Sequence, residues 1–139
     1  MPRILCIDYG KKRCGIAVTD PLQIIATALT AIEANNIINY LKEYFSKEVV
    51  ELILVGEPKN LDDSDTHATQ PVYEFIKRLK KEFPSIPVKT VDERYTSKMA
   101  VQSMIEMGMK KKDRRKKENI DQLAATIMLQ EYLSRAVSR

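Results

Sequence analysis

The stretch LCIDYGKKRCGIAVTD, residues 5–20, decides how the fold begins. Two apolar runs are joined by a Gly-Lys-Lys-Arg turn, which predicts antiparallel strands over 3–8 and 14–19. Asp8 ends the first run. A carboxylate at the end of a core strand is costly to bury unless another group pairs with it. Asp8 is therefore the first candidate functional residue.

The rest of the chain predicts the element order βββαβαβαα. Further strands are expected over 24–31, 50–56 and 87–92, and helices over 33–46, from near Pro71 to Phe83, over 96–107 and over 119–136. The later strands need helical crossovers, so they should join the sheet in parallel. The expected fold class is α/β, one mixed five-stranded sheet flanked by helices.

The size and composition suit one compact domain over residues 1–139. The apolar fraction of 44% excludes a disordered chain, and no apolar run approaches membrane-spanning length. The N-terminus leads directly into a strand without an apolar signal region, so the expected location is cytoplasmic. Cys6 and Cys14 lie in apolar segments and are expected to be buried thiols.

The positive charge is concentrated in one segment. Residues 110–117 hold seven cations and one anion, a local charge of +6, while the remainder of the chain sums to −2. The cations are Lys110, Lys111, Lys112, Arg114, Arg115, Lys116 and Lys117. Such a segment indicates a polyanionic partner, most simply nucleic acid. The alternative is a solvated loop that aids solubility.

Several carboxylates are expected to meet at one edge of the sheet. Asp8 ends the first strand, and Asp92 and Glu93 end the last. Parallel strands open on the same edge, where α/β sheets usually bind ligands. Asp121 is expected in the first turn of the final helix, where neighbouring alanines allow that helix to approach the sheet closely.

Each acid also has an ordinary structural interpretation. Asp8 could cap the turn that follows it, and Asp92 or Glu93 could pair with Arg94 at the surface. Asp121 is favoured in a first helical turn by the helix dipole alone.

Converging carboxylates repel one another unless a cation lies between them. One histidine and two dispersed cysteines offer no ligand set for zinc. An all-oxygen site suits Mg²⁺ or Mn²⁺, and two such ions can activate water against a phosphodiester. Together with the basic segment, this indicates a metal-dependent nuclease.

Four segments, IDYGKKRCGIAVTD, LVGEPKNLDDS, VDERYTS and IDQLAATIMLQEYL, resemble in order and spacing the motifs of the YqgF family. The match runs from about residue 4 to residue 133. Members are Holliday junction resolvase-like proteins, described in bacteria as pre-16S ribosomal RNA nucleases. The resemblance implies a ribonuclease H-like fold, a cytoplasmic protein, and phosphodiester hydrolysis with divalent metal. It also implies that Asp8, Glu93 and Asp121 form the acidic triad.

Two residues depart from the family pattern: Glu57, where many members have an apolar residue, and Asp63, where glycine is common. Glu57 could be a fourth metal ligand or an acid paired with Lys59 or Arg13. Adjacent strand residues point to opposite faces, so only one of Asp92 and Glu93 can point to the site. Alternation does not choose between them, whereas the family pattern favours Glu93.

Other cations are expected near the acids. Lys11, Lys12 and Arg13 fill the turn after Asp8, where they could meet a phosphate or simply solvate the turn. Arg94 could orient the neighbouring acid or anchor a loop.

Three functions follow from this pattern. The first is a nuclease on structured RNA or branched DNA, acting in 5′-end maturation of pre-16S rRNA or on Holliday junction-like DNA. The second is a non-catalytic nucleic-acid-binding module of the same fold in ribosome biogenesis or transcription. The third is a phosphotransferase, which usually needs two such lobes. The expected partners are nucleic acid and a pre-ribosomal particle, without a membrane, for a monomer or a homodimer.

Overall fold

The computed structural model describes residues 2–57, 69–92 and 117–137, and in the last range the side chains of 123–134 only. The strands are β1 (Arg3–Tyr9), β2 (Arg13–Thr19), β3 (Ala26–Glu33), β4 (Val50–Glu57) and β5 (Val88–Asp92). The helices are the 3₁₀ turn η1 (Ala34–Asn36), α1 (Ile37–Lys47), α2 (Thr69–Glu82) and α5 (Lys117–Val137). The helix predicted over 96–107 lies outside the described residues.

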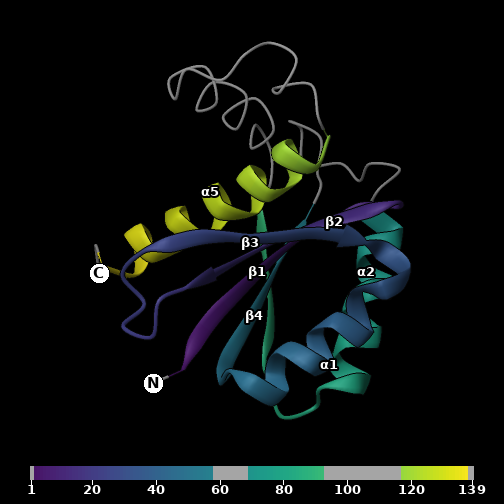
Figure 1. Ribbon diagram of the computed structural model, residues 1–139, viewed down its shortest axis with the longest axis horizontal. Helices are drawn as coiled ribbons and strands as arrows, with labels where there is room; N and C mark the ends of the chain where they lie inside the picture. The colour runs from purple at the N-terminus through teal and green to yellow at the C-terminus, as the bar shows by residue number, and fades with distance from the viewer. Residues whose placement is uncertain (1, 58–68, 93–116, 138–139) are drawn as a thin grey trace.

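The strands form one mixed sheet in the order β3-β2-β1-β4-β5 (Figure 1). β1 and β2 are antiparallel, as are β2 and β3. β4 is parallel to both β1 and β5. The predicted mixed topology is therefore confirmed. The carboxyl ends of β1, β4 and β5 all lie at the same end of the sheet.

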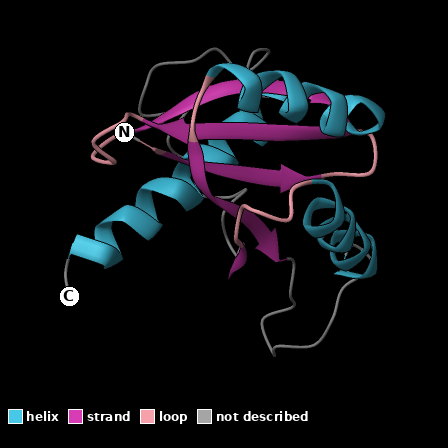
Figure 2. Cartoon of the chain, turned by 90° about the horizontal axis from the view of Figure 1, so that it is seen from below, coloured by secondary structure: helices cyan, strands magenta, loops and turns pink. Residues whose placement is uncertain are grey.

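Helices cover both faces of this sheet (Figures 1 and 2). One apolar cluster joins the sheet to α1 and α2, and the other joins it to α5. In β1, Leu5 and Ile7 belong to the first cluster, whereas Ile4 and Cys6 belong to the second. Because successive strand residues alternate between faces, these memberships assign a face to every position along β1.

Several predicted boundaries are wrong by a few residues. The third strand begins at Ala26 rather than 24, because the Asp20 carboxylate binds the backbone N–H groups of Ile24 and Ile25 and holds them in a loop. The first helix opens with the 3₁₀ turn η1 and becomes α-helical at Ile37. The last helix begins at Lys117 instead of 119, so that lysine belongs to the helix, and Asp121 lies in the second turn.

The interior fits the sequence prediction for apolar residues. Cys6 and Cys14 are buried free thiols on opposite faces of the sheet. Each fully buried Leu or Ile contributes about 1.5–3 kcal/mol to folding.

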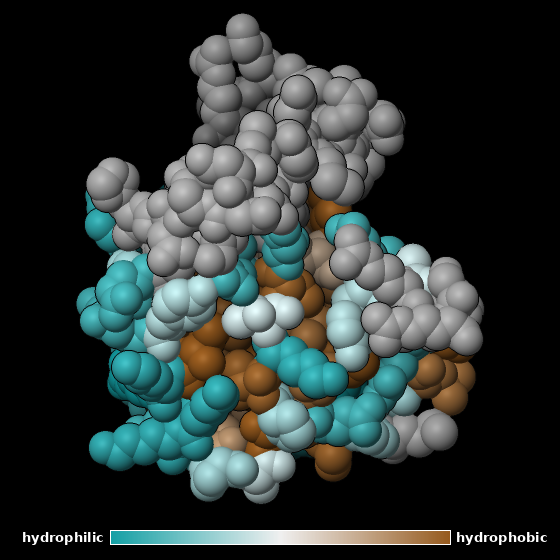
Figure 3. Space-filling model, turned by 180° about the vertical axis from the view of Figure 1, so that it is seen from behind, coloured by the Kyte–Doolittle hydropathy of each residue, from teal (hydrophilic) through white to brown (hydrophobic). Residues whose placement is uncertain are grey.

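Apolar residues also remain visible between polar ones on the face of the molecule seen in Figure 3. Among the described residues, no helix combines the length and apolarity needed to cross a membrane.

Candidate active site

Asp8 lies half-buried near the end of β1, between two positions that have no side chain. It pairs with Gly15 on β2. On the other side, the register that aligns Ile7 with Val55 brings Gly56 of β4 beside it. The two glycines leave the neighbouring strands without a side chain to cover the carboxylate, and they permit another element to approach closely.

The alternation of β1 places Asp8 on the sheet face that packs against α5. Ile4 and Cys6 belong to the cluster that includes residues of α5, and Asp8 is the next residue of the same parity. Asp8 therefore lies on the same side of the sheet as these two apolar residues, further along β1.

Helix α5 contributes a stripe of residues to the same side of the sheet. Ala125, Leu129 and Leu133 recur every four residues and are buried against the sheet, with 0%, 0% and 5% of their surface exposed. Asp121 stands four residues before Ala125, so its backbone lies one turn earlier along this stripe. Its side chain is outside the described residues.

The direction of α5 brings Asp121 towards the Asp8 end of β1. Leu133, late in α5, lines a cavity with Ile4 at the start of β1, and Ala125, eight residues earlier in α5, packs in the same apolar cluster as both. The four residues from Asp121 to Ala125 advance about 6 Å along α5. Two residues of β1, from Cys6 to Asp8, advance a comparable distance of about 6.6 Å.

Glu57 and Asp92 lie on the opposite face of the sheet. The Tyr73 hydroxyl of α2 donates a hydrogen bond to Oε1 of Glu57. Asp92 is aligned with Glu57 across β4 and β5. It lies four residues after Val88, so it faces the same side of the sheet, and Val88 packs against the α1–α2 cluster. Val91, in contrast, packs on the α5 side. Glu93 lies outside the described residues.

Tyr9, the residue after Asp8, anchors the end of β1 to α2. Its ring stacks on Phe75 with 4.3 Å between the ring centroids. Burial raises the pKa of the Tyr9 hydroxyl above its usual value, and the neighbouring Cys14 raises it further. A neutral, stacked tyrosine limits the movement of the strand end that carries Asp8.

The basic turn lies at the same end of the sheet. Lys11 and Lys12 are exposed, whereas Arg13 is half-buried as the first residue of β2. Since Asp8 pairs with Gly15, Arg13 is its diagonal neighbour on the α5 face. Gly10 is required in this turn because a Cβ there would lie 2.5 Å from the Arg13 carbonyl oxygen. Arg94 and residues 110–116 lie outside the described residues.

The described part of the candidate metal site contains one carboxylate of the predicted triad, Asp8. Among the residues that the structure describes with side chains, no group of three or more His, Cys, Asp or Glu could hold a metal ion. The Asp8 carboxylate suits a hard cation such as Mg²⁺ or Mn²⁺, which prefers oxygen ligands.

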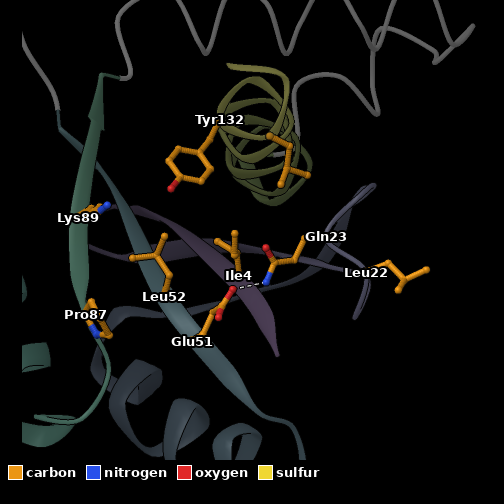
Figure 4. Close-up of a pocket in the computed structure, with 9 residues that line it drawn as sticks. Ile4, Leu22, Gln23, Glu51, Leu52, Pro87, Lys89 and Tyr132 are labelled. Atoms are coloured by element: carbon orange, nitrogen blue, oxygen red, sulfur yellow. Dashed lines mark hydrogen bonds between the residues drawn. The ribbon is translucent and has the colours of Figure 1, made fainter. Parts of the chain in front are cut away.

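A cavity of about 500 Å³ lies at the other end of the α5 face (Figure 4). Ile4, Leu52 and Tyr132 contribute to its lining. Ile4 precedes Asp8 by four residues, or about 13 Å along a strand. Glu51 at this cavity accepts a hydrogen bond from the side chain of Gln23. The cavity is therefore separate from the end of the sheet where Asp8 lies.

Sequence reasoning missed the contributions of Gly15, Gly56 and Tyr73. The two glycines were visible in the sequence, but their position beside Asp8 follows from strand register. Nothing in the sequence connects Tyr73 with Glu57, because that contact depends on how α2 packs on β4.

Comparison with known proteins gives a consistent result. The family model RuvX, described as Holliday junction resolvase, matches residues 2–135. A protein of Flavobacterium psychrophilum named "Putative pre-16S rRNA nuclease" is 50% identical over 99% of this chain and 100% of its own length. A Christiangramia forsetii protein of the same name is 52% identical over 96% of this chain and 98% of its own.

A solved structure shares the fold. Thermus thermophilus RuvC, determined in complex with a Holliday junction substrate, superimposes with a TM-score of 0.58 and 14% identity. The match covers 99% of this chain and 96% of that one. The ribonuclease H-like arrangement expected from the sequence is thereby supported at the level of the fold.

Proposed function

Because the chain belongs to the RuvX family of Holliday junction resolvases, we propose that it is a metal-dependent nuclease that hydrolyses phosphodiester bonds in structured nucleic acid. The proposed substrate is the 5′ end of pre-16S rRNA, in line with the names of relatives that are about half identical over their full length. Branched DNA resembling a Holliday junction is the alternative substrate, in line with the family description.

The proposed metal ligands are Asp8, Glu93 and Asp121. One observation carries this proposal: Asp8 extends the layer formed by Ile4 and Cys6, and the backbone of Asp121 extends the stripe that packs on the same layer. Two carboxylates at the same end of the contact between β1 and α5 would repel each other without a cation between them. A divalent ion removes that repulsion.

The choice of Glu93 over Asp92 is supported by the alternation of side chains along β5. Val91 packs on the α5 side and Asp92 has the opposite parity. By the alternation predicted from the sequence, Glu93 goes with Val91 and therefore with Asp8. The hydrogen bond from Tyr73 to Glu57 supports a structural role for Glu57, on the α2 side, rather than the role of a fourth ligand.

A bound Mg²⁺ or Mn²⁺ would supply a water of lowered pKa and stabilise the leaving oxygen. The chain's own contribution is to hold the carboxylates and to bind the phosphates. We assign phosphate binding to Lys11, Lys12, Arg13, Arg94, Lys110, Lys111, Lys112, Arg114, Arg115, Lys116 and Lys117. Contacts of this kind position the backbone of the substrate and weaken steeply with salt.

Substitution of Asp8 tests the proposal. We expect Asp8→Asn to reduce cleavage of a pre-16S rRNA fragment by at least about a hundredfold, since a metal ligand should matter no less than its supporting residues. The variant should also lose the rise in Tm that Mn²⁺ gives to the wild type. The variant should stay folded without metal, as checked by circular dichroism.

Asp92→Asn is the matched control, because it removes a neighbouring strand-end carboxylate from the other face. It should cleave like the wild type. Equal cleavage by Asp8→Asn and the wild type would contradict the mechanism. Tight, salt-dependent RNA binding without cleavage under any divalent cation would favour the non-catalytic binding module instead.

A further inference from the structure

The connection between β2 and β3 exposes large apolar side chains in an ordered loop. Leu22, Ile24 and Ile25 have 61%, 61% and 60% of their surface exposed. The Asp20 carboxylate accepts hydrogen bonds from the backbone N–H groups of all three, at 3.2, 2.8 and 2.8 Å. These bonds fix the backbone of the loop in a form that exposes its apolar side chains to solvent.

Gln23 in the same loop has an unusual backbone conformation. Its φ of 58° lies in the left-handed region, which costs a non-glycine residue about 1–3 kcal/mol. Its side chain donates hydrogen bonds to the Pro2 carbonyl oxygen, at 3.0 Å, and to Glu51. The loop is thus held in a strained form that keeps three apolar residues in water. A contact that removes them from water would explain why this form is stabilised.

β3, which follows this loop, is an edge strand almost without the charges that usually protect such an edge. The two edges of the sheet are β3 and β5. β5 is short, and its exposed Lys89 and Asp92 discourage pairing with another chain. β3 has eight residues with one charge, Glu33 at its end, and residues 21–32 carry no charge at all. A long, neutral edge strand is a template for pairing with another strand.

The backbone of β3 has donors that do not point towards β2. The Ala26 N–H donates to Oε1 of Gln130 on α5 at 3.2 Å, so this donor does not bond to β2 and is already satisfied. Because donor direction alternates along a strand, we infer that the Ala28 N–H, next to a shift in register, also points away from β2. A shift in register near Leu29 bends the strand. The regular outward edge is the segment that directly follows the apolar loop.

We propose that this surface, defined as the loop 20–25 and the outer edge of β3, binds a second copy of the chain. A two-fold axis would pair the two β3 edges antiparallel, so that the same surface serves both copies. The occupant must offer an uncharged extended edge flanked by apolar residues, and β3 itself has those properties. Self-pairing brings no like charges together over residues 21–32.

A stable dimer through this surface would have to bury about 800 Å² on each partner. A cavity of about 470 Å³ lies between the loop and α5 and is lined in part by Leu22, Ile24 and Leu133. This cavity can receive an apolar side chain from the other copy. β2 separates β3 from β1, so pairing at this edge leaves Asp8 uncovered.

Sedimentation velocity of the full chain tests the proposal over a roughly hundredfold range of concentration. The wild-type mass should rise from 16.0 kDa towards twice that value. Ile25→Lys places a charge in the interface and should weaken association at least about tenfold. Val49→Lys is the matched control, since Val49 is 68% exposed but lies between α1 and β4, and it should associate like the wild type.

Ala28→Pro tests the backbone pairing itself. It removes an outward N–H donor and none that points to β2, so it should abolish association while circular dichroism stays unchanged. Ala28→Lys, at an exposed position, replaces it if the proline variant does not fold. Hydrogen exchange of the β3 amides should slow as the wild type associates. A wild type that stays monomeric, an Ile25→Lys variant that associates normally, or association without protection of β3 would overturn the proposal.

Discussion

Ala125→Leu would test whether the spacing between α5 and the sheet sets the active site. Ala125 is fully buried, and it packs in a cluster with Cys6 and Ala17, which are also fully buried. Leucine adds roughly three carbon atoms where no space exists, and such overpacking costs about 1–3 kcal/mol. The helix can relieve the overlap by moving away from the sheet. Asp121 would move with it, because it lies one helical turn away on the same stripe.

The effect on catalysis should exceed the effect on stability. A displacement of about 1 Å at a reacting group can reduce the rate about a hundredfold. We therefore expect Ala125→Leu to lower kcat for the rRNA substrate by about that factor, while urea unfolding shows a loss of about 1–3 kcal/mol. The assay is cleavage at saturating Mg²⁺ together with a titration of the metal requirement. The variant should need more metal for half-maximal activity.

Leu133→Ala is the matched control at the other end of the stripe. Leu133 is buried with 5% exposed, so its truncation should cost about 2–5 kcal/mol. It lies far from Asp121 and should leave the metal requirement of cleavage unchanged. The reasoning is refuted if both variants lose activity in proportion to their loss of stability, or if Ala125→Leu cleaves like the wild type.

Three further substitutions follow from the structure. Tyr73→Phe removes the hydrogen bond to Glu57 and should lower the free energy of unfolding by about 0.5–1.5 kcal/mol with cleavage retained; a loss of metal binding would instead connect Glu57 with the site. Gly10→Ala puts a Cβ 2.5 Å from the Arg13 carbonyl oxygen, so the turn must shift, and urea unfolding should show a loss of about 1–3 kcal/mol. Asp20→Ala should lower the Tm at pH 7, with a gap from the wild type that closes in acid. Backbone hydrogen bonds hold the pKa of Asp20 below its usual 3.8, so its contribution is present above that pH and lost as the pH falls through the lower folded value; a gap independent of pH would contradict this.

The elements were largely predictable because their signals are local. Short apolar runs predicted all five strands, and the helical spacing of apolar residues predicted the described helices, to within a few residues. The errors arose where a side chain redirected the backbone. Asp20 delays the start of β3 by capping the loop before it, and hydrophobic spacing gives no sign of that bond.

The candidate site was less predictable because its geometry depends on long-range pairing. Asp8 and Asp121 could be selected as strand-end and helix-start acids. The position of Asp8 between Gly15 and Gly56 required the register of three strands. The separation of Glu57 from Asp8 required the packing of α2, because the Tyr73 hydroxyl of α2 donates a hydrogen bond to Glu57 on that side of the sheet.

The sequence by itself determined the order of strands and helices, the strand-end position of the acids and the concentration of positive charge, because each is a property of neighbouring residues. The tertiary structure decided which acids share a face. Alternation gives two equivalent choices within any one strand, and contact with α5 or with α2 selects between them. The tertiary structure also decided that β3 is an outermost strand of the sheet, since strand order is set by pairing between distant segments.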